Sequence, residues 1–118
     1  MRYNSVLDLH THTVASGHAY CSLREMAKAA SEKGLEVLGI TEHAPSMPGT
    51  CHKFYFNNLK VVPREMYGIQ LLLGSEVNIL DAQGTVDLNE KTLSNMDVVI
   101  ASLHTPCMKP CLLYTSPS

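Results

Sequence analysis

The sequence predicts an α/β fold in which helices connect the strands of a parallel sheet, either open or closed into a β/α barrel. Apolar segments of strand length alternate with segments of helical periodicity. One of the apolar segments, 35–40, is almost continuous, as in a strand that is buried on both faces. Each of four apolar segments also runs into a histidine or a glutamate. Because the carboxyl ends of parallel strands share one edge, these side chains are expected to meet there.

The composition is that of one globular domain. The 118 residues are 45% hydrophobic and 17% charged, with a net charge of −2. This charge gives no basis for binding nucleic acid or a membrane surface, and no apolar run approaches the roughly 20 residues that cross a bilayer. Residues 1–5 lack the apolar stretch of a signal peptide. We therefore expect a cytoplasmic protein without a membrane or nucleic-acid partner, and the oligomeric state stays open.

The first strand is expected over 6–10. Ser22 and Glu25 have the spacing of a capping box and predict the start of a helix. This helix is expected over 23–33, because its apolar residues recur at helical spacing and Gly34 ends it.

The second strand is expected over 35–40, followed by a loop rich in proline and glycine over 44–55. A short helix is expected from residue 58, with a second piece that starts at Pro63 and ends at residue 68.

The third strand is expected over 69–73. Segments 77–80 and 85–88 flank a turn and predict a hairpin. A short helix over 89–93 and a fourth strand over 97–103 complete the order.

The first strand ends in the pattern Asp8-x-His10-x-His12, which places three polar side chains on one face. Two neighbouring imidazoles at a strand end can hold one metal ion. Asp8 is placed to accept the spare ring N–H of a ligating histidine from outside the metal site. Taken alone, the pattern also fits a solvated His-x-His at the end of a strand.

The other three strands end in the same way. Glu42 and His43 follow the second strand, Glu76 the third and His104 the fourth. Imidazole and carboxylate together are ligands for zinc, manganese or iron, and the absence of a Cys-x-x-Cys pair argues against a closed structural zinc site. A carboxylate can bridge two metal ions, which imidazole cannot, so Glu76 is the most informative acid.

Two histidines lie in loops. His18, together with His43, can bind a further metal ion. His52 lies in a polar loop and is expected either to be solvated or to contact a substrate phosphate.

Four motifs follow one another along the chain: Asp8-Leu9-His10-Thr11-His12, Ser16-Gly17-His18-Ala19-Tyr20, Ile40-Thr41-Glu42-His43 and Gly74-Ser75-Glu76-Val77-Asn78. Together they resemble the successive motifs of the PHP (polymerase and histidinol phosphatase) family, most closely its small stand-alone phosphatase branch. The resemblance covers about residues 4–110. It implies the N-terminal half of a distorted, seven-stranded, TIM-like β/α barrel with a trinuclear zinc site.

The resemblance implies that up to three Zn²⁺ ions, or Mn²⁺ or Fe²⁺ in their place, are held by six residues: His10, His12, His18, His43, Glu76 and His104. Glu76 would bridge the first two ions, with His12 and His104 beside it as further catalytic residues, and His18 and His43 would hold the third ion. Where the family commonly has aspartate, this chain has Glu42. This difference leaves the position of that supporting carboxylate open.

The function that the resemblance implies is hydrolysis of a phosphate monoester on a small phosphorylated substrate. Two metal ions bridged by Glu76 would lower the pKa of a bound water and supply hydroxide. Four alternatives remain open: a histidinol-phosphate phosphatase, a PHP phosphoesterase that acts on nucleic acid, an amidohydrolase-like metal hydrolase, and a non-catalytic metal-binding module.

Family members are about twice as long as this chain, and a β/α barrel takes about 200 residues or more. Residues 111–118 resemble a translated sequencing adapter, so native sequence is expected over 1–110. A truncated chain that is inactive by itself is therefore expected. The alternative is a short protein with a coiled tail.

Overall fold

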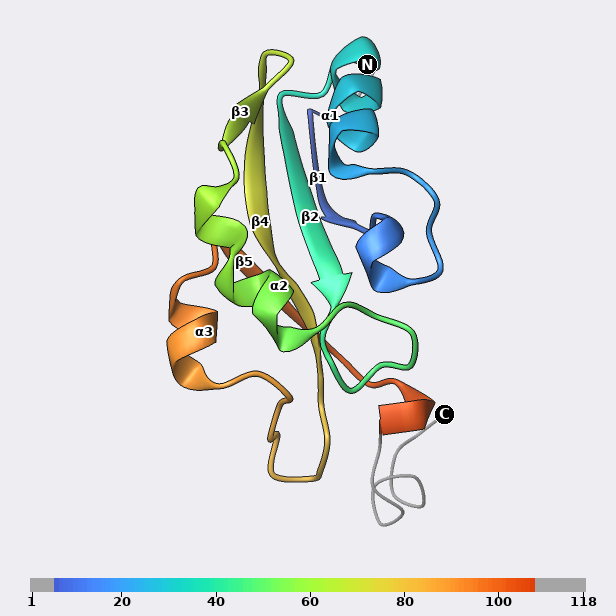
Figure 1. Cartoon of the computed structure of the whole chain (residues 1–118), viewed down its shortest axis with the longest axis vertical. Helices are drawn as coiled ribbons and strands as arrows, with labels where there is room; N and C mark the ends of the chain where they lie inside the picture. The colour runs from blue at the N-terminus through green and yellow to red at the C-terminus, as the bar shows by residue number, and fades with distance from the viewer. Residues whose placement is uncertain (1–5, 108–118) are drawn as a thin grey trace, which may run out of the picture.

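The computed structural model describes residues 6–107, which form one five-stranded sheet and its connecting helices (Figure 1). The strands are β1 (Leu7–Thr11), β2 (Val37–His43), β3 (Glu65–Met66), β4 (Ile69–Asn78) and β5 (Val98–Ser102). The helices are α1 (Leu23–Glu32), α2 (Lys53–Asn57) and α3 (Glu90–Ser94), with 3-10 turns η1 (Val14–Ser16), η2 (Leu59–Val61) and η3 (Thr105–Cys107). The expected tail over 111–118 lies outside the described residues.

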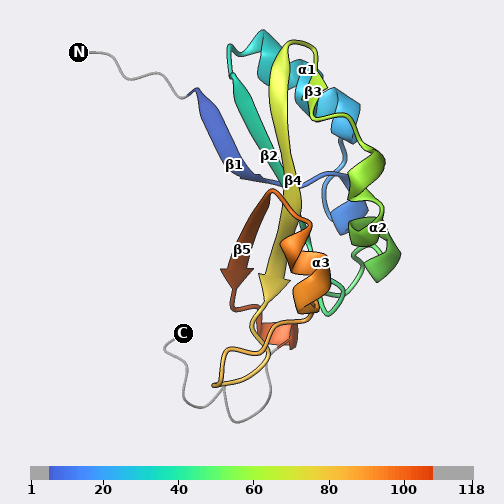
Figure 2. The same ribbon diagram turned by 90° about the vertical axis from the view of Figure 1, so that its left-hand side faces the viewer.

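Four of the strands run parallel in the order β1-β2-β4-β5, and β3 pairs antiparallel with the start of β4. The sheet curls, with α1 and α2 on its convex side, so that it forms about half of a barrel (Figure 2). The predicted parallel β/α sheet is therefore confirmed, whereas the seven strands of a closed barrel remain a prediction. No helix among residues 6–107 is long and apolar enough to cross a membrane.

Helix α1 begins where the capping box predicts. The Ser22 hydroxyl accepts from the Glu25 amide at 3.2 Å, and the Glu25 carboxylate accepts from the Ser22 amide at 2.9 Å. These two bonds satisfy amides that would otherwise lack partners in the first turn. The helix then buries Ala27 and Ala30 in the core that β2, β4 and α2 complete.

The side chains of strand β4 point alternately into the core and onto the concave face of the sheet. Ile69, Leu71 and Leu73 are buried in the core between sheet and helices. Because successive side chains of a strand point to opposite faces, Glu76 lies on the concave face. Between them, Gly74 lets β5 approach, since a Cβ at this position would lie 1.6 Å from the carbonyl oxygen of Val98.

The prediction for residues 58–68 is confirmed in its first part and wrong in its second. A short helical stretch does follow Asn58, as the 3-10 turn η2, although helix α2 already begins before it, at Lys53. The segment after Pro63 is the short strand β3 rather than a second helical piece. Tyr67 and Gly68 explain the difference, because both have positive φ, 54° and 78°, as in a two-residue hairpin turn. This turn leads β3 directly into β4.

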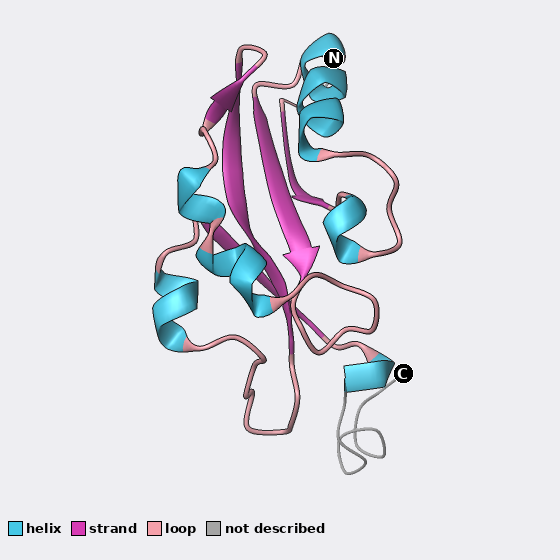
Figure 3. Cartoon of the chain, viewed as in Figure 1, coloured by secondary structure: helices cyan, strands magenta, loops and turns pink. Residues whose placement is uncertain are grey.

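The predicted hairpin after the third strand is reduced to one bridge. Strand β4 continues to Asn78, and a single antiparallel bridge joins Ile79 to Val86. The connections from β2 to α2 and from β4 to α3 are therefore mostly loops (Figure 3). Helix α3 begins as predicted, with Asn89 as its N-cap.

Candidate metal centre

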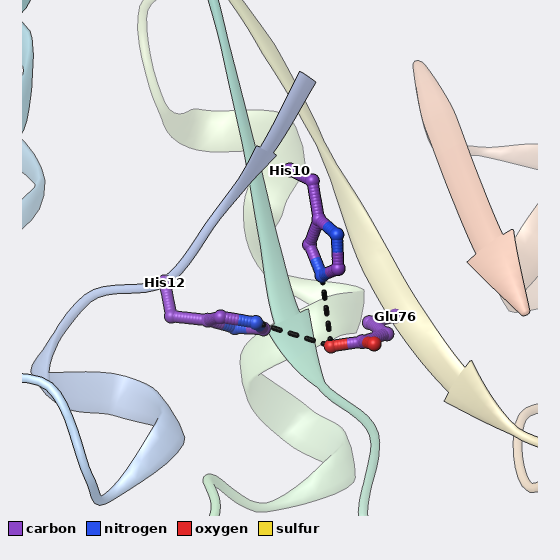
Figure 4. A group of neighbouring side chains, drawn as sticks. All are labelled: His10, His12 and Glu76. Carbon is purple, nitrogen blue, oxygen red and sulfur yellow. Dashed lines mark ion pairs between the residues drawn. The ribbon is translucent and has the colours of Figure 1, made fainter. Parts of the chain in front are cut away.

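Four histidines meet the carboxylate of Glu76. The Nε2 atoms of His10 and His12 each lie 3.1 Å from its Oε1 (Figure 4). The Nδ1 atom of His43 lies 3.3 Å from the same oxygen. On the other side, Nε2 of His104 lies 3.5 Å from Oε2.

The sheet register brings these residues together. Strand β1 delivers His10 and, just past its end, His12, while His43 is the last residue of β2. His43 pairs with Glu76 across the parallel β2–β4 ladder. His104 follows the end of β5, which pairs with the last residues of β4. The structure thus places at one edge the side chains that the sequence predicts there.

His18 joins the same group of rings from the loop after η1. Its ring centroid lies 5.4 Å from that of His12 and 4.8 Å from that of His43, edge-on in both cases. The preceding Gly17 has a φ of 86°, and a Cβ there would lie 2.0 Å from the carbonyl oxygen of Gly49. Glycine is therefore needed for this loop to pack close enough to bring His18 to the cluster.

Two overlapping ligand sets occur among residues 6–107, and both contain Glu76. One set is His10, His12 and Glu76, and the other is His43, Glu76 and His104, with the ligand atoms of each set within 4.8 Å of one another. A carboxylate shared by two such sets is suited to bridging two cations. His18 belongs to neither set, and the structure groups His43 with Glu76 and His104 as closely as with His18.

The protonation states favour metal binding. Burial lowers the pKa of His43 to about 4, and the ring of His12 adds to this effect. Burial also lowers the pKa of His12, against the opposing charge of Glu76. Burial by itself would raise the pKa of Glu76, but the hydrogen bond from Ser102 and the neighbouring rings of His10 and His43 outweigh it, and the net pKa is lowered. Neutral imidazoles around an ionised carboxylate are the states that a metal ion requires.

The hydrogen bonding inside the cluster is incomplete. Nδ1 of His43 and Oε1 of Glu76 are both buried and have no hydrogen-bond partner. Buried polar atoms normally have partners, and neutral imidazoles supply little charge to offset the carboxylate. A divalent cation would satisfy both atoms, so the residues present fit a metal ion.

Glu42 supports the cluster from the other face of β2. Its carboxylate accepts from the Thr13 amide at 2.8 Å, from the Thr13 hydroxyl and from the Ser16 hydroxyl at 2.8 Å. The Tyr55 hydroxyl donates to it at 3.3 Å, and burial raises the pKa of that phenol. Glu42 reaches His12 only at 3.9 Å, so its contact with the cluster passes through Ser16.

Asp8 takes another partner than the expected histidine ring, whereas His52 is exposed to solvent, as the first of its two expected states requires. The Asp8 carboxylate accepts from the backbone amide of His10 at 3.2 Å, not from a histidine ring. His52 is the N-cap of α2, where its Nδ1 accepts from the Phe54 amide at 3.1 Å. Of the six histidines of the sequence, His52 is the one that the structure leaves outside the cluster. Its contact with a substrate phosphate remains a prediction.

Sequence reasoning missed the neutral side chains that hold the cluster. Ser16 contacts the ring of His12 at 3.1 Å, Asn78 bonds the ring of His104, and Ser102 donates to Glu76 at 2.8 Å. The one usable signal was spacing, since Asn78 stands two residues after Glu76 and so shares its face of β4.

A curled parallel β/α sheet with histidines and a glutamate at its carboxyl edge defines a barrel-type scaffold with a candidate metal centre. The chain matches the family described as the PHP domain over residues 8–117. It is 58% identical over 110 residues to a probable phosphatase of Clostridium novyi (strain NT), covering 93% of this chain and 44% of that protein. It is 50% identical over 110 residues to a probable phosphatase of Caldanaerobacter subterraneus subsp. tengcongensis, covering 93% and 43%. The chain belongs to the PHP domain family, and it spans less than half the length of these relatives.

Proposed function

We propose that this chain provides metal ligands and catalytic residues of a metal-dependent phosphatase that hydrolyses phosphate monoesters of small molecules. The observation that carries the proposal is the position of Glu76, which belongs to both ligand sets. Its Oε1 faces His10, His12 and His43, and its Oε2 faces His104. The names of the relatives, probable phosphatases, support the reaction class. Zinc is the metal that we propose, because the nearby donors are imidazole nitrogens and carboxylate oxygens.

The residues around Glu76 have different roles in the proposed site. His10, His12 and His104 present ring nitrogens to Glu76, and Ser102 fixes the carboxylate by donating to Oε2 at 2.8 Å. Metal ions bound there would supply hydroxide at neutral pH and offset the negative charge of a phosphate group. The His10 side chain is 48% exposed, so a substrate is expected to enter from the β1 side of the cluster.

No serine of the described site is free to act as a nucleophile. The Ser16 hydroxyl donates to Glu42 at 2.8 Å, and the Ser75 hydroxyl donates to the backbone carbonyl of Glu42 at 3.1 Å. Both residues are completely buried, and an activated serine needs a base that accepts its proton and access to the substrate. Water is therefore the proposed attacking group.

The test uses the protein expressed from its complete gene, with hydrolysis of an aryl phosphate monoester as the readout. Removal of metal with a chelator should abolish turnover, and added zinc should restore it. Glu76→Gln should lower kcat by more than about 100-fold, because an amide cannot balance two cations and several kcal/mol of charge stabilisation are lost. An aryl phosphate diester, tested in parallel, should be hydrolysed much more slowly.

Glu65→Gln is the matched control. Glu65 is exposed on β3, at the opposite end of the sheet, and the same change there should leave kcat unaltered. Turnover without metal, or full activity of Glu76→Gln, would contradict the proposed function.

A further inference from the structure

A chain of hydrogen bonds leads from the cluster to Asp87, in the loop between β4 and α3. Nδ1 of His104 bonds Oδ1 of Asn78. The Nδ2 of Asn78 in turn donates to Oδ2 of Asp87 at 2.6 Å. Asp87 does not touch Glu76 or any histidine through these bonds, so any influence on the cluster passes through Asn78.

Asp87 determines which atom donates and which accepts in each of these hydrogen bonds. An ionised carboxylate can only accept, and Asp87 also accepts from the amides of Asn78 and Ser46, each at 2.9 Å. The carbonyl oxygen of Ala44 lies 3.3 Å from the same Asn78 nitrogen and is a second acceptor. Two acceptors therefore face the NH₂ end of a side chain that is completely buried, and its oxygen must face His104.

An amide oxygen cannot donate, so the His104 Nδ1 must carry the hydrogen of the bond to Asn78. In neutral imidazole the other nitrogen then has a free lone pair. This nitrogen, Nε2, is the atom that lies 3.5 Å from Oε2 of Glu76.

On the opposite side of the cluster, other residues set the same hydrogen-bond direction at His12: its Nδ1 donates and its Nε2 carries no hydrogen. The Ser16 hydroxyl donates to the Glu42 carboxylate at 2.8 Å and accepts from the His43 amide at 3.0 Å. With its one hydrogen used on Glu42, Ser16 can only accept from Nδ1 of His12, at 3.1 Å. Nε2 of His12, 3.1 Å from Glu76, is again the nitrogen without a hydrogen.

We propose that Asp87 is a positioning residue that, through Asn78, holds His104 in the Nδ1–H tautomer and thereby presents a bare Nε2 to the cluster. The proposal rests on the proposed function only where it makes that nitrogen a metal ligand. The tautomer itself is a property of the metal-free protein and is tested separately.

The experiment labels histidine with ¹⁵N in the metal-free protein from the complete gene and records long-range ¹H–¹⁵N correlations at about pH 8, above the ordinary histidine pKa. His104 should show the Nδ1–H pattern. Asp87→Asn should produce a mixture of both tautomers, because the new amide can present either an acceptor or a donor to Asn78. The same variant should weaken zinc binding by roughly 10- to 100-fold, as loss of a supporting partner usually does.

Asp97→Asn is the matched control. Asp97 accepts from the Leu73 amide of β4 at 2.9 Å, as Asp87 does from that of Asn78, but its side-chain partner is Arg64. This variant should retain the Nδ1–H form of His104.

An Nε2–H pattern in the unmodified protein would overturn the proposal, and so would an unchanged tautomer in folded Asp87→Asn. If Asp87→Asn fails to fold, the spectrum of the unmodified protein decides. Absent zinc binding and turnover with His104 still in the Nδ1–H form would refute the proposed function and leave the role of Asp87 standing.

Discussion

His43 and Glu76 lie opposite each other on two paired parallel strands, and each contributes to the shift in the other's pKa. His43 is nearly inaccessible to solvent, and burial lowers its pKa to about 4. An imidazole that stays neutral at pH 7 and below is ready to bind a cation without first losing a proton. The same burial makes the metal-free protein sensitive to acid.

The first prediction concerns this acid sensitivity. The pKa of His43 is about 4 in the folded protein and near the ordinary histidine value of 6.5 in the unfolded chain, so between these values the unfolded chain binds more protons. The free energy of unfolding should therefore fall as the pH is lowered from 6.5 towards 4. Urea unfolding of the metal-free protein from the complete gene at pH 7 and pH 5 measures this change. His43→Gln should reduce the pH dependence, and an equal dependence in that variant would contradict the assignment.

At the residue scale, the sequence predicted where the candidate metal ligands lie better than it predicted the hydrogen-bond partners of the residues around them. His10, His12, His43, Glu76 and His104 could be placed because each follows an apolar strand, and strand ends share one edge. The contacts of Ser16 and Asp87 could not be predicted, since they depend on how two loops fold back against β2 and β4. Asp8 shows the same limit, because its face was predicted but its backbone partner was not.

At the element scale, the strands were predicted well and the segment between β2 and β4 was not. Strand-length apolar runs and the capping box of α1 are local signals that the tertiary structure does not override. Pro63 suits the first turn of a helix or the approach to a strand equally well. The turn at Tyr67 and Gly68 makes this segment a strand rather than a helix. It requires a positive φ at Tyr67, which is uncommon for tyrosine and could not be predicted from the sequence.

The η1 loop gives the second prediction. Gly17 and Gly84 both have positive φ, 86° and 83°, but only at Gly17 would a Cβ meet another backbone. Gly84→Ala measures the cost of the backbone conformation by itself. Gly17→Ala should lower the free energy of unfolding by clearly more than about 1 kcal/mol and should weaken zinc binding, because the loop that carries His18 must move. Equal effects of the two variants in thermal unfolding would show that the contact with Gly49 is unimportant.

At the scale of the whole molecule, the described chain is a half-barrel with open edges. Within residues 6–107, β1 pairs only with β2, and β5 pairs only with β4. Large apolar side chains are exposed on or beside these two strands: Val6, Leu7, Leu9, Val99 and Leu103. Unpaired strand edges beside exposed apolar groups favour association with other chains.

The third prediction follows from these edges. The 118-residue chain, expressed by itself, should self-associate as its concentration rises, as measured by size-exclusion chromatography with light scattering. Leu7→Lys should increase the monomer fraction, because an edge charge opposes strand pairing. A stable monomer that unfolds cooperatively at all concentrations would contradict this prediction.

The central claim is that Glu76 is shared between metal ions held by histidines from different strands. Anomalous X-ray scattering at the zinc edge tests it most directly, on crystals of the protein from its complete gene grown with zinc. We predict anomalous peaks within coordination distance, about 2.0–2.2 Å, of both Glu76 oxygens and of Nε2 of His10, His12 and His104. Crystals of Glu76→Gln should lose at least one of these peaks. Zinc-loaded crystals without a peak beside Glu76 would contradict the account.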